Sequence, residues 1–356
     1  MVVVTVLLGS SSGSHNFRPE TPKPAAWSTV LQPLPVFKAS SLEKMTLNRG
    51  TVHSSSATTT TATTLPHIPL LFGLGAQLHG DLSARLFQEA PVNLLTSWFS
   101  GPADLTFLRG YETKSVPAAY AQGKSLQLIV WTGSDEVTLA TKYGPACGRS
   151  YPFSSSFESD MQELATIFSG SGPLYVSMFT EFQTYPCKDN IWQGNENYFS
   201  ALKDQYRVAQ RIFKTYAPNA QLSLTWGGWQ GSWDDPGRGG GASLLPHFAD
   251  VMNASDFQSF QAMDSHSNVA DIKTMTRLLH GYGVGAHNKV MVAHYKPDNQ
   301  SQVTWQTDLD AIFVPDVMAG LQQNGLFAFS FMDEQNINAS EASYQQAKQI
   351  VSTYGQ

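Results

Sequence analysis

A single carboxylate, Glu181, closes a segment that is otherwise apolar or uncharged, PLYVSMFTE (173–181). Burial among such residues raises the pKa of a carboxyl group, which can then hold a proton near neutral pH and act as a general acid. Cleavage of a glycosidic bond needs such an acid and a second carboxyl group, about 5–5.5 Å away for retention or about 6.5–9.5 Å away for inversion. Glu181 is therefore the candidate general acid/base.

Seven other apolar runs also end near residues that can do chemistry. They are PLLFGLG (69–75), VNLLTSWF (92–99), LQLIVWTG (126–133), QLSLTWGGW (221–229), FQSFQAMDSH (257–266), KVMVAHYKP (289–297) and LFAFSFMDE (326–334). Asp264, in the sixth of the eight runs, is the leading candidate for the second carboxylate. Glu334, at the end of the eighth run, is the reserve, and its neighbour Asp333 is a further possibility.

Aromatic and imidazole rings near the same run ends are candidates for sugar binding, because flat rings stack on sugar faces. The segment TWGGWQGSW (225–233) alone carries three tryptophans on a glycine-rich stretch. The alternative is that these tryptophans pack as a plug under a loop. The predicted substrate-binding residues are Trp98, Trp131, Trp226, Trp229, His266, His294 and Tyr295.

The runs alternate with amphipathic segments that predict helices. These segments are 81–89, 101–109, 116–122, 155–169, 196–216, 243–251, 269–282, 302–323 and 340–354. Eight strands, each followed by a helix, predict an α/β fold, a single-domain (β/α)₈ TIM barrel over residues 65–356, whose C-terminal strand ends form one active-site face. The alternative is an open doubly wound sheet, but FGLGAQLHGD (72–81) lacks the third glycine of a dinucleotide-binding turn.

Other chemistries fit the sequence less well. His79, His266 and His294 with Asp264 would be a possible metal set, but metal-dependent barrels of the amidohydrolase type open with His-x-His and the first run here supplies one histidine. Lys296 could form a Schiff base, although its place before a proline favours an ordinary loop lysine. No G-x-S-x-G motif is present. We expect no metal and no organic cofactor.

The composition favours a neutral ligand that stacks on aromatic rings, such as a carbohydrate. Charged residues make up 14% of the chain and aromatic residues 12%. The net charge of −6 argues against nucleic acid as a partner. No apolar run approaches the ~18 residues of a membrane span. We expect a monomer.

The first 64 residues differ from the rest. They begin with the apolar run VVVTVLLG and continue with Ser, Thr and Pro, including SSSATTTTATT (54–64), which predicts a disordered leader that is a signal or other targeting segment. The two cysteines, Cys147 and Cys187, follow neighbouring predicted strands, so we expect their loops to meet and form a disulfide. Glycosylation sequons occur at Asn253, Asn299 and Asn338. These features predict a secreted or cell-wall protein, with organelle targeting as the alternative.

From about residue 68 to residue 350 the chain resembles the clan of retaining glycoside hydrolases built on (β/α)₈ barrels, which includes mannanases, xylosidases and endoglucanases. Strand four of that clan ends in the acid/base Glu, usually after Asn, and the matching pair here is Thr180-Glu181. Strand six commonly ends in a His or Tyr near the substrate, and AMDSHS (262–267) matches it with His266. Strand seven ends in the nucleophilic Glu, whereas VMVAHYKPDN (290–299) has His294 at that place.

The histidine at the nucleophile position leaves three interpretations open. Another acid could be the partner of Glu181, the pair could act with inversion, or the barrel could bind sugars without cleaving them. The resemblance implies a glycoside hydrolase acting on an oligosaccharide or polysaccharide. The competing hypothesis is a non-catalytic carbohydrate-binding relative attached to a cell wall.

Overall fold

The computed structural model describes residues 68–75, 82–133, 135–184, 187, 195–234, 243–264 and 266–356. The predicted leader, residues 1–64, lies outside this part of the chain. So does one residue singled out in the sequence, His79, which follows the first strand.

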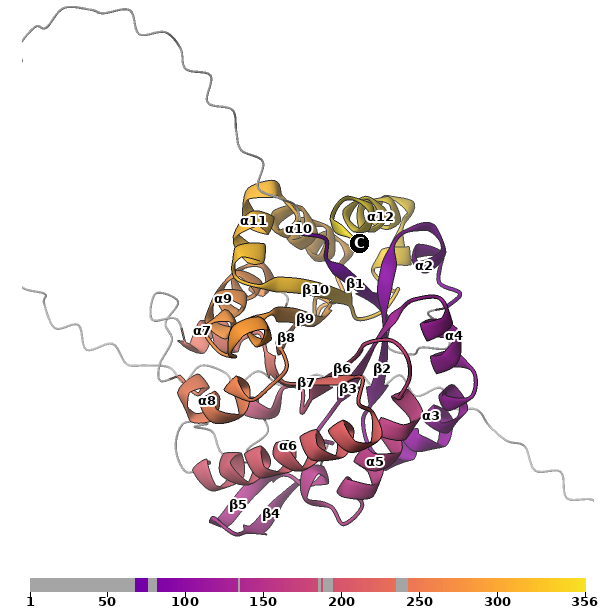
Figure 1. The fold of residues 1–356 in the computed structure, drawn as a ribbon. Coiled ribbons are helices and arrows are strands. Elements are labelled where there is room, and N and C mark those ends of the chain that lie inside the picture. The colour runs from indigo at the N-terminus through magenta and orange to yellow at the C-terminus, as the bar shows by residue number, and fades with distance from the viewer. Residues whose placement is uncertain are drawn as a thin grey trace, which may run out of the picture. The chain divides into compact units, whose positions relative to one another are not determined.

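Eight parallel strands close into a barrel, as the alternation of runs predicted (Figure 1). The first strand pairs with both the second and the last, so the sheet has no open edge and the doubly wound alternative is wrong. The strands are β1 (Leu71–Leu74), β2 (Val92–Phe99), β3 (Ser125–Val130), β6 (Leu174–Met178), β7 (Ala220–Gly227), β8 (Gln258–Ala262), β9 (Val290–Tyr295) and β10 (Leu326–Phe331).

Helices surround the barrel and cover its outer apolar face (Figure 1). The predicted helix 302–323 is two helices, because Pro315 has no N–H for an intrahelical bond and disfavours helical backbone at the residue before it. The described helices are α2 (Arg85–Glu89), α3 (Leu105–Glu112), α4 (Ser115–Ala121), α5 (Phe157–Phe168), α6 (Glu196–Tyr216), α7 (Gln230–Asp234), α8 (Leu245–Asn253), α9 (Asn268–His280), α10 (Gln302–Ile312), α11 (Pro315–Gln323) and α12 (Glu341–Tyr354). None of them is long and apolar enough to cross a membrane.

An antiparallel hairpin, β4 (Glu136–Thr141) and β5 (Gly144–Arg149), stands between β3 and α5 and was not predicted. It is fixed to α6, because the Tyr143 hydroxyl donates to Asp204 (2.9 Å) and the Asn197 amide donates to the carbonyl of Pro145 (3.0 Å). The predicted disulfide is confirmed: Cys147 on β5 is bonded to Cys187, with their Cα atoms 5.3 Å apart. The bond therefore ties the segment after β6 to a hairpin that is itself held against α6.

The interior of the barrel changes character along its axis. Inward side chains near the N-terminal strand ends form an apolar cluster of Leu71, Leu94, Tyr175, Phe257, Met291, Ala293 and Ala328. The next layer is polar: the Thr96 hydroxyl donates to Gln127 (3.0 Å), whose amide donates to Ser177 (3.2 Å). Toward the C-terminal strand ends the side chains inside the barrel are thus polar and hydrogen-bonded to one another.

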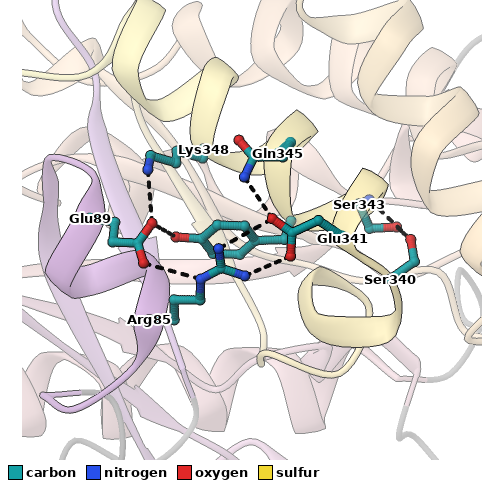
Figure 2. Close-up of polar contacts among 8 residues, drawn as sticks. Arg85, Glu89, Ser340, Glu341, Ser343, Gln345 and Lys348 are labelled. Atoms are coloured by element: carbon teal, nitrogen blue, oxygen red, sulfur yellow. Dashed lines mark hydrogen bonds and ion pairs between the residues drawn. The ribbon is translucent and has the colours of Figure 1, made fainter.

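The first and last of the described helices, α2 and α12, are joined by a group of charged and aromatic side chains, which we call the outer clasp (Figure 2). Arg85 donates to Glu341 (2.8 Å) and its guanidinium lies 3.6 Å above the ring of Tyr344. Glu89 accepts from Lys348 and from the Tyr344 hydroxyl, both at 2.8 Å, and also from Arg85. The clasp fastens together the two ends of the helix layer.

Candidate active site

The turn that carries Glu181 has an unusual backbone. Phe179 and Glu181 both adopt left-handed φ angles, 56° and 61°, directly after β6. Such angles are costly for residues with a Cβ and persist only where surrounding contacts enforce them, often at functional sites. The structure therefore places the candidate acid, half-buried, on a constrained turn at the C-terminal end of a barrel strand.

Hydrogen bonds to two other strands hold this turn. The hydroxyl of Thr180 donates to the side-chain carbonyl of Gln261 on β8 (3.0 Å). The buried amide of Gln183 donates to the backbone carbonyl of Gly227 on β7 (3.1 Å) and accepts from the N–H of the same residue (3.2 Å). Residues on both sides of Glu181 are thus fixed to neighbouring strand ends.

Aromatic packing holds the turn from the outside, and it corrects the prediction for Trp226. Phe182 packs against Trp226 with ring centroids 4.7 Å apart, and Phe248 on α8 lies at 4.7 Å from Phe182. Trp226 has no exposed surface. It alternates with inward-facing Thr225 and Gly227, so its side chain points into the helix layer, where it packs in the core and cannot stack on a sugar.

Trp229 lies at the strand end instead. Its partly exposed indole folds back over Gly227, where an added Cβ would lie 2.3 Å from the ring. The position of the Trp229 ring therefore requires a glycine at position 227. Trp131, after β3, is also partly exposed, with the guanidinium of Arg149 at 5.8 Å from its ring. Both rings remain candidates for sugar stacking.

His294 and Trp98 meet inside the barrel, with ring centroids 4.8 Å apart. His294 is fully buried, and its burial lowers the imidazole pKa to about 3, so the ring is neutral. The β8 residue opposite His294 is Gln261, which also accepts from Thr180. Gln261 is thus both the register partner of His294 and the residue that accepts a hydrogen bond from the turn that carries Glu181.

Tyr295, the neighbour of His294, faces the opposite way, which corrects its predicted role. It is 1% exposed, and its hydroxyl donates to Asp308 on α10 (3.0 Å). Tyr295 therefore belongs to the interface between β9 and α10.

Lys296 forms an ion pair with Asp333 after β10 (2.5 Å) and donates to Gln335 (3.0 Å). The pair neutralises Asp333 as well as the lysine.

The two candidates for the second carboxylate each have one oxygen engaged locally. Oδ1 of Asp264 accepts from the N–H groups of His266 (2.6 Å) and Ser267 (2.8 Å) before α9. Oε2 of Glu334 accepts from Asn338 (2.6 Å). His266 is exposed. These contacts orient each carboxylate through one of its two oxygens.

A further acid, Asp298 after β9, was not among the predicted site residues. Its pKa is raised, first by partial desolvation and then by the negative charge of Asp264. Burial also raises the pKa of Asp308, to which Asn268 and Tyr295 donate. The motif YKPDN contains Asp298 directly after the seventh strand, so its position was the signal that could have identified it.

In the part of the chain that the structure describes, no group of three or more His, Cys, Asp or Glu side chains is arranged to hold a metal ion.

Comparison with known proteins finds likeness only among solved structures. No protein-family model matches the chain, and no curated protein matches it. A GH26-CBM35 β-(1,4)-mannanase of Podospora anserina aligns at 10% identity and a TM-score of 0.45, over 81% of this chain and 61% of its own. A psychrophilic glycoside hydrolase family 10 endo-β-1,4-xylanase aligns at 9% identity and a TM-score of 0.49, over 74% of this chain and 86% of its own.

A third solved structure, β-glucuronidase 2 of Bacteroides uniformis, aligns at 10% identity and a TM-score of 0.46. The alignment covers 74% of this chain and 30% of the glucuronidase. This chain thus spans less than two thirds of the mannanase and of the glucuronidase. What the structure itself establishes is the closed eight-stranded barrel and the placement of its rim residues.

Proposed function

We propose that the chain is a glycoside hydrolase that cleaves an oligosaccharide or polysaccharide with Glu181 as general acid/base. The observation that carries the proposal is the turn after β6: two left-handed residues, with hydrogen bonds to β7 and β8, hold a carboxylate at the C-terminal end of the barrel strands. A structural surface acid would need no such restraint.

In the proposed reaction the carboxyl group of Glu181 donates its proton to the glycosidic oxygen as the bond to the anomeric carbon breaks. A second carboxylate either attacks that carbon or removes a proton from an attacking water. Asp264 is the leading partner and Glu334 the reserve. Trp131, Trp229 and the exposed His266 would line the sugar subsites.

A second candidate function is carbohydrate binding without cleavage. In the sequence resemblance, His294 falls at the clan's nucleophile position, and the fact that this residue is buried and neutral favours the non-catalytic alternative. An imidazole cannot serve as the carboxylate acceptor of the retaining reaction.

Hydrolysis of a panel of β-linked glucans, mannans and xylans, followed by reducing-end release, separates the two functions. The hydrolase proposal expects release from at least one polymer, and proton NMR of the first product then gives the anomeric outcome. Inversion would favour a partner at about 6.5–9.5 Å from Glu181, and retention one at about 5–5.5 Å. Binding without any release would support the non-catalytic function.

We also propose that the protein is secreted and glycosylated. The disulfide between Cys147 and Cys187 is typical of oxidising compartments. The three sequon residues, Asn253, Asn299 and Asn338, are all exposed, so each is accessible to a glycosyltransferase. Expression in a secreting eukaryotic host with and without N-glycosidase treatment tests this, the expected result being a loss of mass on treatment.

A further inference from the structure

The hairpin outside the barrel has one covered edge and one open edge. Figure 1 shows β5 next to α6 and β4 outermost. The carbonyl of Pro145 on β5 accepts from Asn197 of α6 (3.0 Å), and a Cβ added at Gly148 would lie 2.3 Å from Tyr198 of the same helix. The free edge of β5 is thus covered by α6, whereas β4 pairs with no described strand other than β5.

Alternate residues of β4 direct their backbone groups away from β5. Ala140 lies opposite Pro145, which has no N–H and whose carbonyl bonds to Asn197, so these two residues form a non-hydrogen-bonded pair. Because the two kinds of pair alternate along an antiparallel ladder, Thr138 and Glu136 also direct their N–H and C=O groups outward. All three residues are exposed, and in the described part of the chain no hydrogen bond engages these outward backbone groups.

β4 also lacks the features by which proteins protect exposed edge strands. Protected edges carry a proline, a bulge or a lysine within the strand. The sequence EVTLAT (136–141) contains none of these residues, and its register with β5 runs without a bulge. The hairpin is fixed in place, since the Tyr143 hydroxyl donates to Asp204 (2.9 Å) and the disulfide holds Cys147. Such a rigid edge binds another strand at little cost in conformational ordering.

Two copies of β4 are complementary to each other in antiparallel pairing. One register pairs Thr138 with Ala140 through their outward backbone groups and sets Glu136 opposite Lys142 at both ends. Registers shifted by two positions bring Glu136 opposite Ala140 or Gly144 and lose the match of charges. The strand therefore selects one self-complementary register.

The present partners of the two charged side chains leave them available. Glu136 is 40% exposed and lies 3.7 Å from Arg149. Lys142 is 69% exposed and pairs with Asp204 (2.9 Å), which also pairs with Arg207 (3.2 Å). Exposed ion pairs of this kind contribute little, so exchanging them for pairs across an interface costs little.

We propose that the protein forms a two-fold symmetric dimer in which β4 of one copy pairs with β4 of a second copy. The outer strands of the resulting four-stranded sheet are the two β5 strands, whose edges α6 covers, so assembly stops at two copies. The sequence led us to expect a monomer, but that expectation took no account of a hairpin that the sequence did not predict. The inference goes beyond the proposed function and does not depend on it.

Sedimentation equilibrium of the full chain, with its disulfide intact, tests the dimer. One strand pair makes a small interface, so we expect a dissociation constant on the order of 10–100 µM. The mass should rise from that of one chain toward twice that value between about 5 and about 500 µM. A monomer at every concentration would overturn the proposal.

Two substitutions at position 138 locate the interface. Thr138→Pro removes an outward N–H that makes no bond to β5, so the hairpin should remain while the dimer is lost. Thr138→Val keeps the N–H and the β-branched shape, and should dimerise like the parent. If Thr138→Pro dimerises as well as Thr138→Val does, the contact lies elsewhere and the proposal fails.

Charge variants test the register. Glu136→Lys and Lys142→Glu each set like charges opposite one another in a homodimer, and each alone should weaken dimerisation about tenfold. An equimolar mixture of the two variants sets opposite charges together at both ends and should dimerise nearly as well as the parent. Single variants that dimerise normally, or a mixture that stays monomeric, would contradict the pairing.

A synthetic peptide of residues 135–142 distinguishes a second copy from a different partner. Calorimetric binding of this peptide to a chain that stays monomeric would show that the edge accepts a strand but not a second copy, which also overturns the dimer. None of these measurements uses a substrate, so a failure of the hydrolase proposal leaves their outcome unaffected.

Discussion

The indole of Trp98 and the imidazole of His294 lie 4.8 Å apart between ring centroids, inside the end of the barrel that carries Glu181. The histidine is also fully buried. A histidine at the end of the seventh barrel strand is thus a neutral, aromatic-packed group and not a substitute carboxylate. In the proposed hydrolase the chemistry therefore falls to Glu181 and to another carboxylate.

His294 should make stability depend on pH. Its pKa is lowered to about 3 in the folded chain and is about 6.5 when unfolded, so between these values only the unfolded chain takes up the proton. The free energy of unfolding should therefore fall as pH drops from about 6.5 to about 3, by up to ~1.4 kcal/mol per pH unit from this group. His294→Gln should remove that slope in urea unfolding at pH 6, 5 and 4.

The control for the loss of one imidazole is His287→Gln, since the side chain of His287 is 51% exposed. If His294→Gln keeps the full pH dependence of the unsubstituted chain, His294 is not held neutral in the folded state.

Trp226 and Trp229, three residues apart, should respond differently to truncation. Trp226 is fully buried against Phe182 and Phe248, so Trp226→Ala should lower the free energy of unfolding by about 3–5 kcal/mol. Trp229 is partly exposed, and Trp229→Ala should weaken sugar binding about tenfold, with a smaller effect on stability. Urea unfolding and calorimetry on both variants decide this, and equal stability losses with unchanged affinity would remove Trp229 from the subsites.

The disulfide should stabilise the chain by restricting its unfolded state. Cys147 and Cys187 are 40 positions apart, and closing a loop of that size is worth about 3–4 kcal/mol on the chain-entropy model. The double variant Cys147→Ser, Cys187→Ser should lose about that much in urea unfolding under oxidising conditions. Under full reduction the variant and the parent should unfold alike, and a difference that persists there would trace the loss to the serines themselves.

The outer clasp should matter more than an isolated surface ion pair. Arg85 pairs with two carboxylates (Figure 2) and also stacks on Tyr344, whereas among the described residues Arg109 pairs with Glu163 alone. Isolated exposed pairs contribute little. Arg85→Ala should therefore lower the melting temperature more than Arg109→Ala. Equal melting temperatures in calorimetric scans would show that the clasp adds nothing beyond an ordinary pair.

Acid should weaken the clasp. Bonds from Lys348, Tyr344 and Arg85 hold the pKa of Glu89 at about 2, below its ordinary value near 4.5. A lowered folded pKa means that the stabilisation is present above about pH 4.5 and is lost as pH falls toward 2. The difference in melting temperature between the parent and Glu89→Gln should accordingly shrink over that range.

The barrel could be predicted from the sequence because each strand is a short apolar run followed by a helix, and such runs signal burial on both faces. The run 92–99 coincides with β2, and the helix 196–216 coincides with α6. The hairpin at 136–149 escaped prediction because much of it is exposed, leaving no continuous apolar run. Pro315 could have indicated the break between α10 and α11, but the helical pattern continues on both sides of it, so a single helix was predicted.

The site could be predicted only in part, because a position along a run does not fix the direction of a side chain. Trp226 and Tyr295 were correctly placed at strand ends, yet both point outward, as alternation from their inward neighbours Gly227 and His294 requires. The register between paired strands determines which side chains face the barrel interior, and the sequence alone does not give that register. The contact between Trp98 and His294 joins residues 196 positions apart, which no local pattern reveals.

The most direct test of the central claim compares Glu181→Gln on two glycosides that share one sugar but differ in leaving group. Hydrolysis of an alkyl-linked substrate needs a proton on the leaving oxygen, so its kcat/KM should fall about 10²–10⁴-fold. Bond cleavage in a 2,4-dinitrophenyl glycoside needs no such proton, so this loss should largely disappear, and Glu158→Gln, on an exposed α5 residue, should affect neither substrate. Equal losses on both substrates, or no loss on the alkyl glycoside, would contradict Glu181 as the general acid.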